Sequence, residues 1–360
     1  MATLTVGPGS IFPSVAAVMA VAAAGDTIVI QAGYGPETAT VSFDKMTFTG
    51  PGTGSGPIPP RVTLRLGAGV TTVTLAGNTP LDVLDNALGN TILSTDTNAN
   101  LITVTDGADT VSGSGFASVD TLFVDYHLAT GAVTGTWSAG FSEASGTRSV
   151  TIAGGASFQA MDIRTGSGNH DLRGAGSGFG SLEGWAGNDR LEATTRWTLN
   201  GGPGADTLIF TDQAQRGAFS YAKASAGVTA NLLNPLANTG EAAGDAYVYD
   251  GAVDLLGSVF NDVLTLGNGG GQLSGVQGDD TLIGGTGVDT LFGAAGLNHL
   301  IGGAGADSLN GAGGLSFASY ATAVGGVDAS MISPGANTGK AAGDSYVSIR
   351  GASERPSSTR

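Results

Sequence analysis

Apolar residues recur at every ninth position in one stretch of the chain, residues 257–319. The stretch divides without a slip into seven units, which read GSVFNDVLT, LGNGGGQLS, GVQGDDTLI, GGTGVDTLF, GAAGLNHLI, GGAGADSLN and GAGGLSFAS. The eighth position of successive units is occupied by Leu264, Leu273, Leu282, Leu291, Leu300, Leu309 and Ala318. An apolar period of nine fits neither an amphipathic helix nor a heptad repeat, whereas tandem units of fixed length indicate a solenoid.

Each unit has the composition of a turn followed by a short strand. The first six positions are rich in glycine, which favours a tight turn whose backbone carbonyls can converge. The last three positions form a very short strand whose central leucine points inward, so that stacked units bury a ladder of leucines that one unit could not bury alone. We expect two units to make one coil, which places residues 18 apart on the same edge of the solenoid.

The sixth position of most units carries a side-chain oxygen, and stacking brings these oxygens together. Two carboxylates that face each other between stacked turns repel strongly unless a cation lies between them. A hard cation with six or more oxygen ligands suits such a site, with carboxylates and turn carbonyls as its ligands. The side chains concerned are Asp262, Asp280, Asp289, Asp307 and Asn298. The glycines whose turns would supply carbonyls are Gly275, Gly284, Gly285, Gly287, Gly302, Gly303 and Gly305.

Two of the units, GGTGVDTLF and GGAGADSLN, fit the pattern G-G-x-G-x-D-x-U-x in full, where U is a large apolar residue. The tandem array resembles the RTX, or hemolysin-type calcium-binding, repeat. The resemblance implies a parallel β-roll, several calcium ions held in its turns, and export of the unfolded chain by type I secretion. Some units depart from the pattern, because Gly271 and Ser316 replace the acidic residue and Phe260 replaces the fourth-position glycine. Not every turn should therefore hold an ion of full affinity.

Further copies of the unit lie upstream of the array. GGPGADTLI, at residues 201–209, is complete, and GWAGNDRLE, at residues 184–192, is nearly so. Their aspartates, Asp206 and Asp189, are additional candidate ligands, although they are 17 residues apart instead of 18. A unit from residue 165 carries His170 where aspartate is expected, which we interpret as a degenerate turn in preference to a weak metal ligand.

A longer duplication flanks the array. Residues 220–248 and 319–347 are identical at 18 of 29 positions, and their offset is 99 residues, or eleven nines. We call these two segments the first and second spacer. After the second spacer the chain ends in SIRGASERPSSTR without a new block of repeats. We expect this end to be truncated, and divergence of its sequence is the alternative.

The N-terminal region begins with an apolar, alanine-rich stretch. Residues 11–25 resemble the apolar part of a secretory signal, but Pro13 interrupts them and no basic residue precedes Lys45. A short helix that starts near Pro13 or Ser14 and stops at Gly25 is the preferred prediction, and a cleaved signal is the alternative.

Short β-rich runs follow between residues 26 and 115, bounded by Gly, Asn and Asp. Their order, a helix, then GDTIVIQAG, then stacked apolar strands, resembles the entry to a right-handed parallel β-helix of the pectin-lyase type. The helix would then cap the open end of the core. The expected fold is therefore all-β, a right-handed parallel β-helix and β-roll solenoid. Its expected segments are 1–115 (β-helix-like), 116–219 (β-rich, degenerate units), 220–256 (spacer), 257–319 (calcium-binding roll) and 320–360 (second spacer and tail).

Composition removes several function classes. The chain of 360 residues has no Cys, which excludes a disulfide framework and thiolate metal sites. The formal charge of -16 argues against nucleic acid as a partner. No stretch reaches the roughly 18 to 20 apolar residues of a membrane span.

Two hypotheses remain for the whole chain. The first is an extracellular or cell-surface structural or adhesive module, with calcium and an extracellular polysaccharide as its partners. The second is a carbohydrate-active β-helix enzyme, a polysaccharide lyase or epimerase, with an RTX tail. The residues that could serve as a catalytic base are few, because the only histidines are His127, His170 and His299. Alternation along a strand puts Asp125 and His127 on one face and Tyr126 on the other, which is typical of an ordinary strand end.

Overall fold

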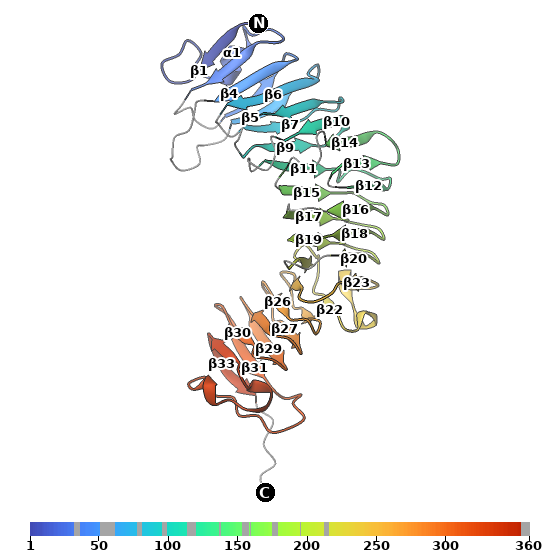
Figure 1. Cartoon of the computed structure of the whole chain (residues 1–360), viewed down its shortest axis with the longest axis vertical. Coiled ribbons are helices and arrows are strands. Elements are labelled where there is room, and N and C mark those ends of the chain that lie inside the picture. Colours follow the sequence, from blue (N-terminus) through green and yellow to red (C-terminus); the bar gives the residue numbers. More distant parts are fainter. Residues whose placement is uncertain are drawn as a thin grey trace. The chain divides into compact units, whose positions relative to one another are not determined.

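A computed structural model describes residues 1–31, 37–50, 62–77, 81–95, 99–113, 120–136, 138–152, 158, 160–174, 179–194, 196–211 and 216–353. The chain forms two compact units, residues 1–181 and 182–360. Both are built almost entirely of parallel β-strands (Figure 1), so the prediction of an all-β parallel solenoid is confirmed. The five-segment division of the chain stays a prediction. Within the described residues, no helix is long and apolar enough to cross a membrane.

The first unit stacks its strands in two sheets, and consecutive strands from β2 to β11 alternate between them. One sheet has the order β1 (Thr3–Val6), β2 (Thr27–Ile30), β4 (Met46–Gly50), β6 (Thr72–Gly77), β8 (Thr91–Ser94), β10 (Gly107–Ser112), β14 (Arg148–Ile152), β13 (Gly140–Glu143), β12 (Val133–Thr136) and β16 (Asp171–Gly174). The other has the order β3 (Glu37–Val41), β5 (Val62–Leu66), β7 (Leu81–Leu84), β9 (Leu101–Val104), β11 (Thr121–Asp125) and β15 (Ala160–Arg164). β17 (Phe179–Glu183) crosses the boundary between the two units.

One strand of the first unit departs from the predicted stack. β13 runs antiparallel to both of its neighbours, β12 and β14. The chain reverses on both sides of β13 at glycines with left-handed backbones, Gly140 with φ +112° and Gly146 with φ +74°. Glycine adopts such angles without steric cost, so a hairpin can replace one parallel coil here.

The N-terminal helix is shorter than predicted. α1 spans Val15–Met19 and begins at Ser14, whose side chain accepts a hydrogen bond of 3.0 Å from the Ala17 N–H. The prediction that it would continue to Gly25 is wrong. After Met19 the chain turns, and the Ala23 N–H is held by the carboxylate of Asp26, 2.9 Å away, at the start of the next strand. Val15, Val18 and Met19 are nevertheless buried, as a capping helix requires.

The second unit contains strands of three sheets, and within the roll their register is the 18 residues that the repeat predicts. In one sheet the order is β18 (Arg190–Ala193), β20 (Thr207–Phe210) and β23 (Ala246–Val248). In the second it is β19 (Trp197–Asn200), β21 (Ala218–Ser220), β24 (Asp254–Leu256), β26 (Gly271–Ser274), β28 (Asp289–Phe292), β30 (Ser308–Asn310) and β32 (Ser345–Val347). In the third it is β22 (Thr229–Asn231), β25 (Val263–Thr265), β27 (Thr281–Gly285), β29 (Leu297–Gly303), β31 (Leu315–Ser319) and β33 (Ile349–Ser353). Thus Leu264 pairs with Leu282, and Leu273 with Leu291.

The core of the roll is the predicted ladder of leucines. All six repeat leucines and Ala318 are fully buried. Burying one such side chain stabilises a fold by about 1.5–3 kcal/mol, so the stacked coils share a continuous apolar interior.

Each spacer contains the last strand of one sheet, while another sheet continues with strands on both sides of the spacer. At the first spacer, one sheet ends with β23 and another begins with β22, whereas β21 and β24 continue the third. At the second spacer, the sheet that contains β30 ends with β32, and β31 is followed by β33. Short 3₁₀ turns lie in both copies, at Pro235–Ala237 and Gly240–Ala242 and at Pro334–Ala336 and Gly339–Ala341.

Candidate metal centre

The sixth-position side chains form two ladders of hydrogen bonds along the roll. In the first, the Asp262 N–H donates to Asp280 Oδ1 at 2.9 Å, and the Asp280 N–H donates to Asn298 Oδ1 at 3.0 Å. In the second, the Asp289 N–H donates to Asp307 Oδ1 at 2.9 Å. The backbone of each coil is thus held by a side chain that lies 18 residues later. The structure places three of the five side chains that the sequence selected in the first ladder and two in the second, and all five are buried.

In several of these aspartates only one carboxylate oxygen, Oδ1, accepts a hydrogen bond of the ladder. In the described part of the chain, Oδ2 of Asp206, of Asp280 and of Asp307 is buried and accepts no hydrogen bond. A buried carboxylate oxygen without a partner is costly. The pKa of Asp280 and of Asp307 is accordingly raised to about 7, chiefly by burial, with backbone N–H donors opposing the rise and neighbouring carboxylates adding to it. Burial is also the main cause that raises the pKa of Asp289.

Asp262 differs from the other ladder carboxylates because it has local donors. The Ser258 N–H donates to its Oδ2 at 2.6 Å, and the Ser258 hydroxyl lies 2.9 Å from its Oδ1. The Val228 N–H of the first spacer donates to Oδ1 at 2.8 Å. Ser258 therefore supplies Asp262 Oδ2 with a hydrogen-bond donor, whereas Asp280 Oδ2 has none.

The first glycine of each unit leaves room for the carboxylate of the same unit. A Cβ atom at Gly275 would lie 2.1 Å from Asp280 Oδ2, a distance that no real Cβ atom shows. Equivalent contacts are 2.5 Å from Gly284 to Asp289 Oδ2 and 2.4 Å from Gly302 to Asp307 Oδ2. The carboxylate oxygens thus occupy the space that a side chain would take.

The remaining predicted glycines bring backbone oxygens of stacked turns close together. A Cβ atom at Gly305 would lie 2.1 Å from the Gly287 carbonyl oxygen. One at Gly303 would lie 2.2 Å from the Gly285 carbonyl oxygen, and Gly303 has a left-handed φ of +105°. The carbonyl oxygens of Gly285 and Gly287 therefore lie against the glycines of the next coil, and their role as ligands stays a prediction.

The upstream units form the same ladder despite their spacing of 17 residues. The Asp189 N–H donates to Asp206 Oδ1 at 2.8 Å, and burial raises the pKa of Asp206 to about 8. Gly184 and Gly201 leave room for these carboxylates, because their Cβ atoms would lie 2.3 Å and 2.0 Å from Asp189 Oδ2 and Asp206 Oδ2.

His170 occupies a ladder position without offering a metal ligand. Its Nδ1 accepts a hydrogen bond of 2.9 Å from the Val133 N–H, and its Nε2 lies 3.3 Å from the Gly166 carbonyl oxygen. Burial lowers its pKa, so a neutral ring that uses both nitrogens fits the site. The interpretation as a degenerate turn agrees with this geometry.

Sequence reasoning missed two aspartates that end the ladders. Asp245 of the first spacer accepts from the Asp206 N–H at 2.9 Å, and Asp344 of the second accepts from the Asp307 N–H at 2.9 Å. Their second oxygens are hydrogen-bonded: Tyr221 donates to Asp245 at 2.6 Å and Tyr320 donates to Asp344 at 2.5 Å. A tyrosine hydroxyl therefore completes each ladder end. The signal was present, because Gly240 and Asp245, like Gly339 and Asp344, are five residues apart, which is the spacing of the first and sixth positions of a unit.

The same hydrogen bond recurs in the first unit, where sequence reasoning assigned no site. The Asn90 N–H donates to Asp109 Oδ1 at 2.8 Å, and the Asn100 N–H donates to Asp120 Oδ1 at 2.9 Å. The predicted strand end is also as expected: Tyr126 is fully buried, and the His127 Nδ1 atom lies 2.8 Å from Asp125 Oδ1 on the accessible side.

The donor set of the roll suits a hard cation that takes most of its ligands from the backbone. No described group of three or more His, Asp or Glu side chains could hold a metal by itself. The available donors are single carboxylates with a spare oxygen and the carbonyls of stacked turns, all of them oxygen. Calcium accepts six to eight such ligands in flexible geometry.

Comparison with known proteins identifies the array. A profile of the RTX calcium-binding nonapeptide repeat (4 copies) matches residues 265–300 and again residues 274–309. No curated protein matches the chain. The nonapeptide run of this chain therefore belongs to the RTX calcium-binding repeats, and the ion that these repeats bind is calcium.

Proposed function

We propose that calcium drives the folding of the roll and that the chain works outside the cell as a structural or adhesive module. The observation that supports the proposal best is the buried, unpartnered Oδ2 of Asp280 and of Asp307. In the absence of metal these oxygens oppose folding, and a cation that accepts them converts the same groups into ligands.

The ligands would come from consecutive coils. Asp280 and Asn298 would serve one edge, with Asp262 contributing less because Ser258 already satisfies it. Asp289 and Asp307 would serve the other edge, and Asp189 and Asp206 an upstream site. The carbonyls of Gly275, Gly284, Gly285, Gly287, Gly302, Gly303 and Gly305 would complete the shells. When bound, calcium supplies positive charge that removes the repulsion between these buried carboxylates.

The coupling to calcium would give the chain a compartment switch. Extracellular modules bind calcium at about 0.1–1 mM, so a chain in the cytosol would stay loose and compatible with type I secretion. Outside the cell it would fold. The charge of -16 adds self-repulsion that disfavours the compact state until cations bind.

Calcium titration of the full chain tests the proposal. Circular dichroism follows overall folding, and hydrogen–deuterium exchange reports on peptides from residues 257–319. We expect protection of these peptides to rise at millimolar calcium. Magnesium should substitute poorly, because it demands a tighter octahedral shell. Equal protection in chelator and in calcium would contradict the proposal.

A further inference from the structure

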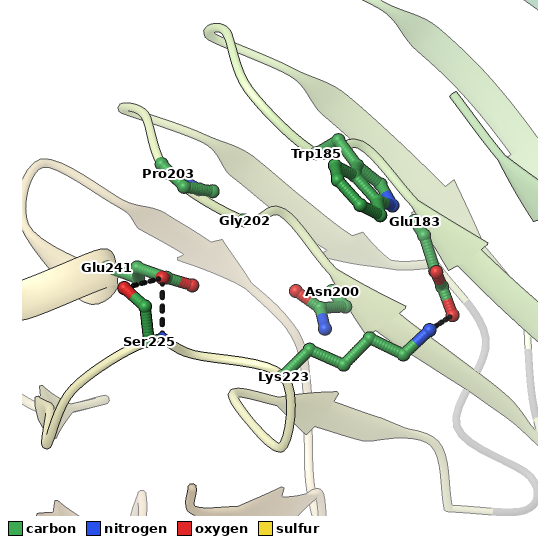
Figure 2. Close-up of a pocket in the computed structure, with 8 residues that line it drawn as sticks. All are labelled: Glu183, Trp185, Asn200, Gly202, Pro203, Lys223, Ser225 and Glu241. Carbon is green, nitrogen blue, oxygen red and sulfur yellow. Dashed lines mark hydrogen bonds and ion pairs between the residues drawn. The ribbon is translucent and has the colours of Figure 1, made fainter. Parts of the chain in front are cut away.

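A pocket of about 340 Å³ opens where the first spacer meets the upstream coils. Its volume lies within the range of roughly 300–1,000 Å³ that is usual for small-molecule sites. Figure 2 shows its lining residues around one hollow. The coils contribute Glu183, Trp185, Asn200, Gly202 and Pro203, and the spacer contributes Lys223, Ser225 and Glu241.

Trp185 is the one aromatic side chain among the described residues that line the pocket. It is 46% exposed, although tryptophan is on average a strongly buried residue. Trp185 occupies the second position of the unit GWAGNDRLE and has a left-handed φ of +61°. The second position of the unit GGPGADTLI is Gly202, which has a φ of +89°. Val276, Ala294 and Ala312 hold the same position of later units and also have positive φ, from +39° to +73°. The angle therefore belongs to the turn of the repeat, and the large exposed aromatic side chain is what distinguishes Trp185.

The polar groups of the pocket leave one uncompensated negative charge, that of Glu241, together with hydrogen-bonding capacity. Lys223 Nζ lies 2.5 Å from Glu183 Oε1, so these charges offset each other. Glu241 uses only its Oε1 to accept from the Ser225 N–H and hydroxyl, at 2.9 Å and 3.0 Å. Its Oε2 is engaged in neither bond, and the amide of Asn200 also lines the hollow.

The second spacer shows that these polar residues are not needed for the fold. It repeats the tyrosine and aspartate contacts of the first spacer, yet the counterparts of Lys223, Ser225 and Glu241 are Thr322, Val324 and Lys340. The scaffold is therefore duplicated while the lining of the pocket is not. This difference separates the pocket residues from the structural requirements of the spacer.

We propose that this pocket binds a neutral saccharide. The C–H face of a sugar ring stacks on an exposed indole, and its hydroxyls pair with the amide of Asn200, the free carboxylate oxygen of Glu241 and the ammonium of Lys223. A single tryptophan does not form the cage that a quaternary cation requires. An anionic sugar is disfavoured by Glu241 and by the charge of the chain. The inference deepens the adhesive role proposed above and rests on it.

Isothermal titration calorimetry on the full chain in saturating calcium tests the site. The probes are cellopentaose, maltopentaose, mannopentaose and xylopentaose, with pentagalacturonate as the anionic counterpart. Circular dichroism and exchange protection first establish that calcium has folded each variant, so a failure of calcium folding is recorded separately from a failure of sugar binding. The variants are Trp185→Gly, which suits the left-handed backbone, Trp185→Phe, Glu241→Gln, and Phe260→Ala as a control.

We expect at least one neutral probe to bind, Trp185→Gly to weaken that binding by about tenfold or more, and Trp185→Phe to retain part of it. Phe260 is 43% exposed, so Phe260→Ala removes a comparable aromatic surface elsewhere and should leave binding unchanged. Glu241→Gln keeps an oxygen acceptor and should weaken binding of a neutral sugar only slightly. The proposal is overturned if no neutral probe binds the folded chain, if Trp185→Gly binds as well as the wild type, or if pentagalacturonate binds more tightly than every neutral probe.

Discussion

Replacing Asp280 with Asn should change stability in opposite directions with and without calcium. Asn keeps the Oδ1 acceptor for the Asp262 N–H and removes the charge from a side chain that is fully buried. The pKa of Asp280 is raised from 3.8 to about 7. At about 1.4 kcal/mol per pH unit, its ionised form disfavours the metal-free roll by up to about 4 kcal/mol at pH 8. Asp280→Asn should therefore stabilise the metal-free roll by at most this amount.

Calcium should reverse the advantage. At about 10 mM calcium and a dissociation constant of about 0.1–1 mM, each site adds about 1.4–2.7 kcal/mol to the free energy of unfolding. Asp280 stacks between Asp262 and Asn298, so its loss removes one or two sites. The gain in stability on adding calcium should fall by about 1.4–5 kcal/mol in the variant.

Hydrogen–deuterium exchange of peptides from residues 257–319, in chelator and in calcium, measures both effects locally. Asp279→Asn is the matched control, because Asp279 is the exposed neighbour and also accepts a backbone N–H, from Leu297, at 2.7 Å. It should leave the calcium response unchanged. If Asp280→Asn destabilises the roll equally in chelator and in calcium, the buried carboxylate does not act as a ligand and the reasoning fails.

Two further predictions concern acidity and turn glycines. Burial raises the pKa of Asp206 to about 8 and of Asp307 to about 7, so the metal-free fold binds more protons than the unfolded chain and loses stability as pH rises from about 4 to about 8. Protonation then stabilises the fold in place of calcium, so the calcium concentration at half-folding, followed by circular dichroism, should fall as pH falls from about 8 to about 5. A Cβ atom at Gly204 would lie 1.6 Å from the Gly187 carbonyl oxygen, whereas one at Gly325 would meet nothing within 4 Å. Gly204→Ala should lower the melting temperature in calcium markedly, and Gly325→Ala should not; equal effects would show that the turns are not closely stacked.

The register of the roll could be predicted because one property repeats without interruption. A leucine at every ninth residue has only one way to be buried at every coil, and this requires the pairing of residues 18 apart that Leu264 and Leu282 show. The position of the candidate ligands follows, because the sixth residue of each unit has a fixed relation to the leucine. The stacking of Asp280 beneath Asn298 is therefore a consequence of the apolar pattern.

The features of the fold that the sequence did not predict depend on contacts between residues outside the nine-residue pattern. Tyr320 reaches Asp344 across 24 residues, and a period of nine cannot indicate such a pair. Asp26, the residue before β2, binds the Ala23 N–H outside the helix, so the length of α1 depends on a residue beyond the apolar stretch. The antiparallel β13 depends on two glycines, Gly140 and Gly146, that look like any other turn glycines in a chain that contains 62 of them.

The termination of one sheet at each spacer makes the parity of the repeat count matter. Seven units separate the spacers, and their strands alternate between two sheets, so the strands of the first and last units, β25 and β31, lie in the same sheet. Because the number of units is odd, the sheet that contains β30 has its last strand, β32, in the second spacer, and the sheet that contains β31 extends to β33. Adding or deleting one unit would exchange the two faces, whereas adding or deleting a pair would preserve them. The increment by which this roll can lengthen without moving its surfaces is thus 18 residues, twice the period that is visible in its sequence.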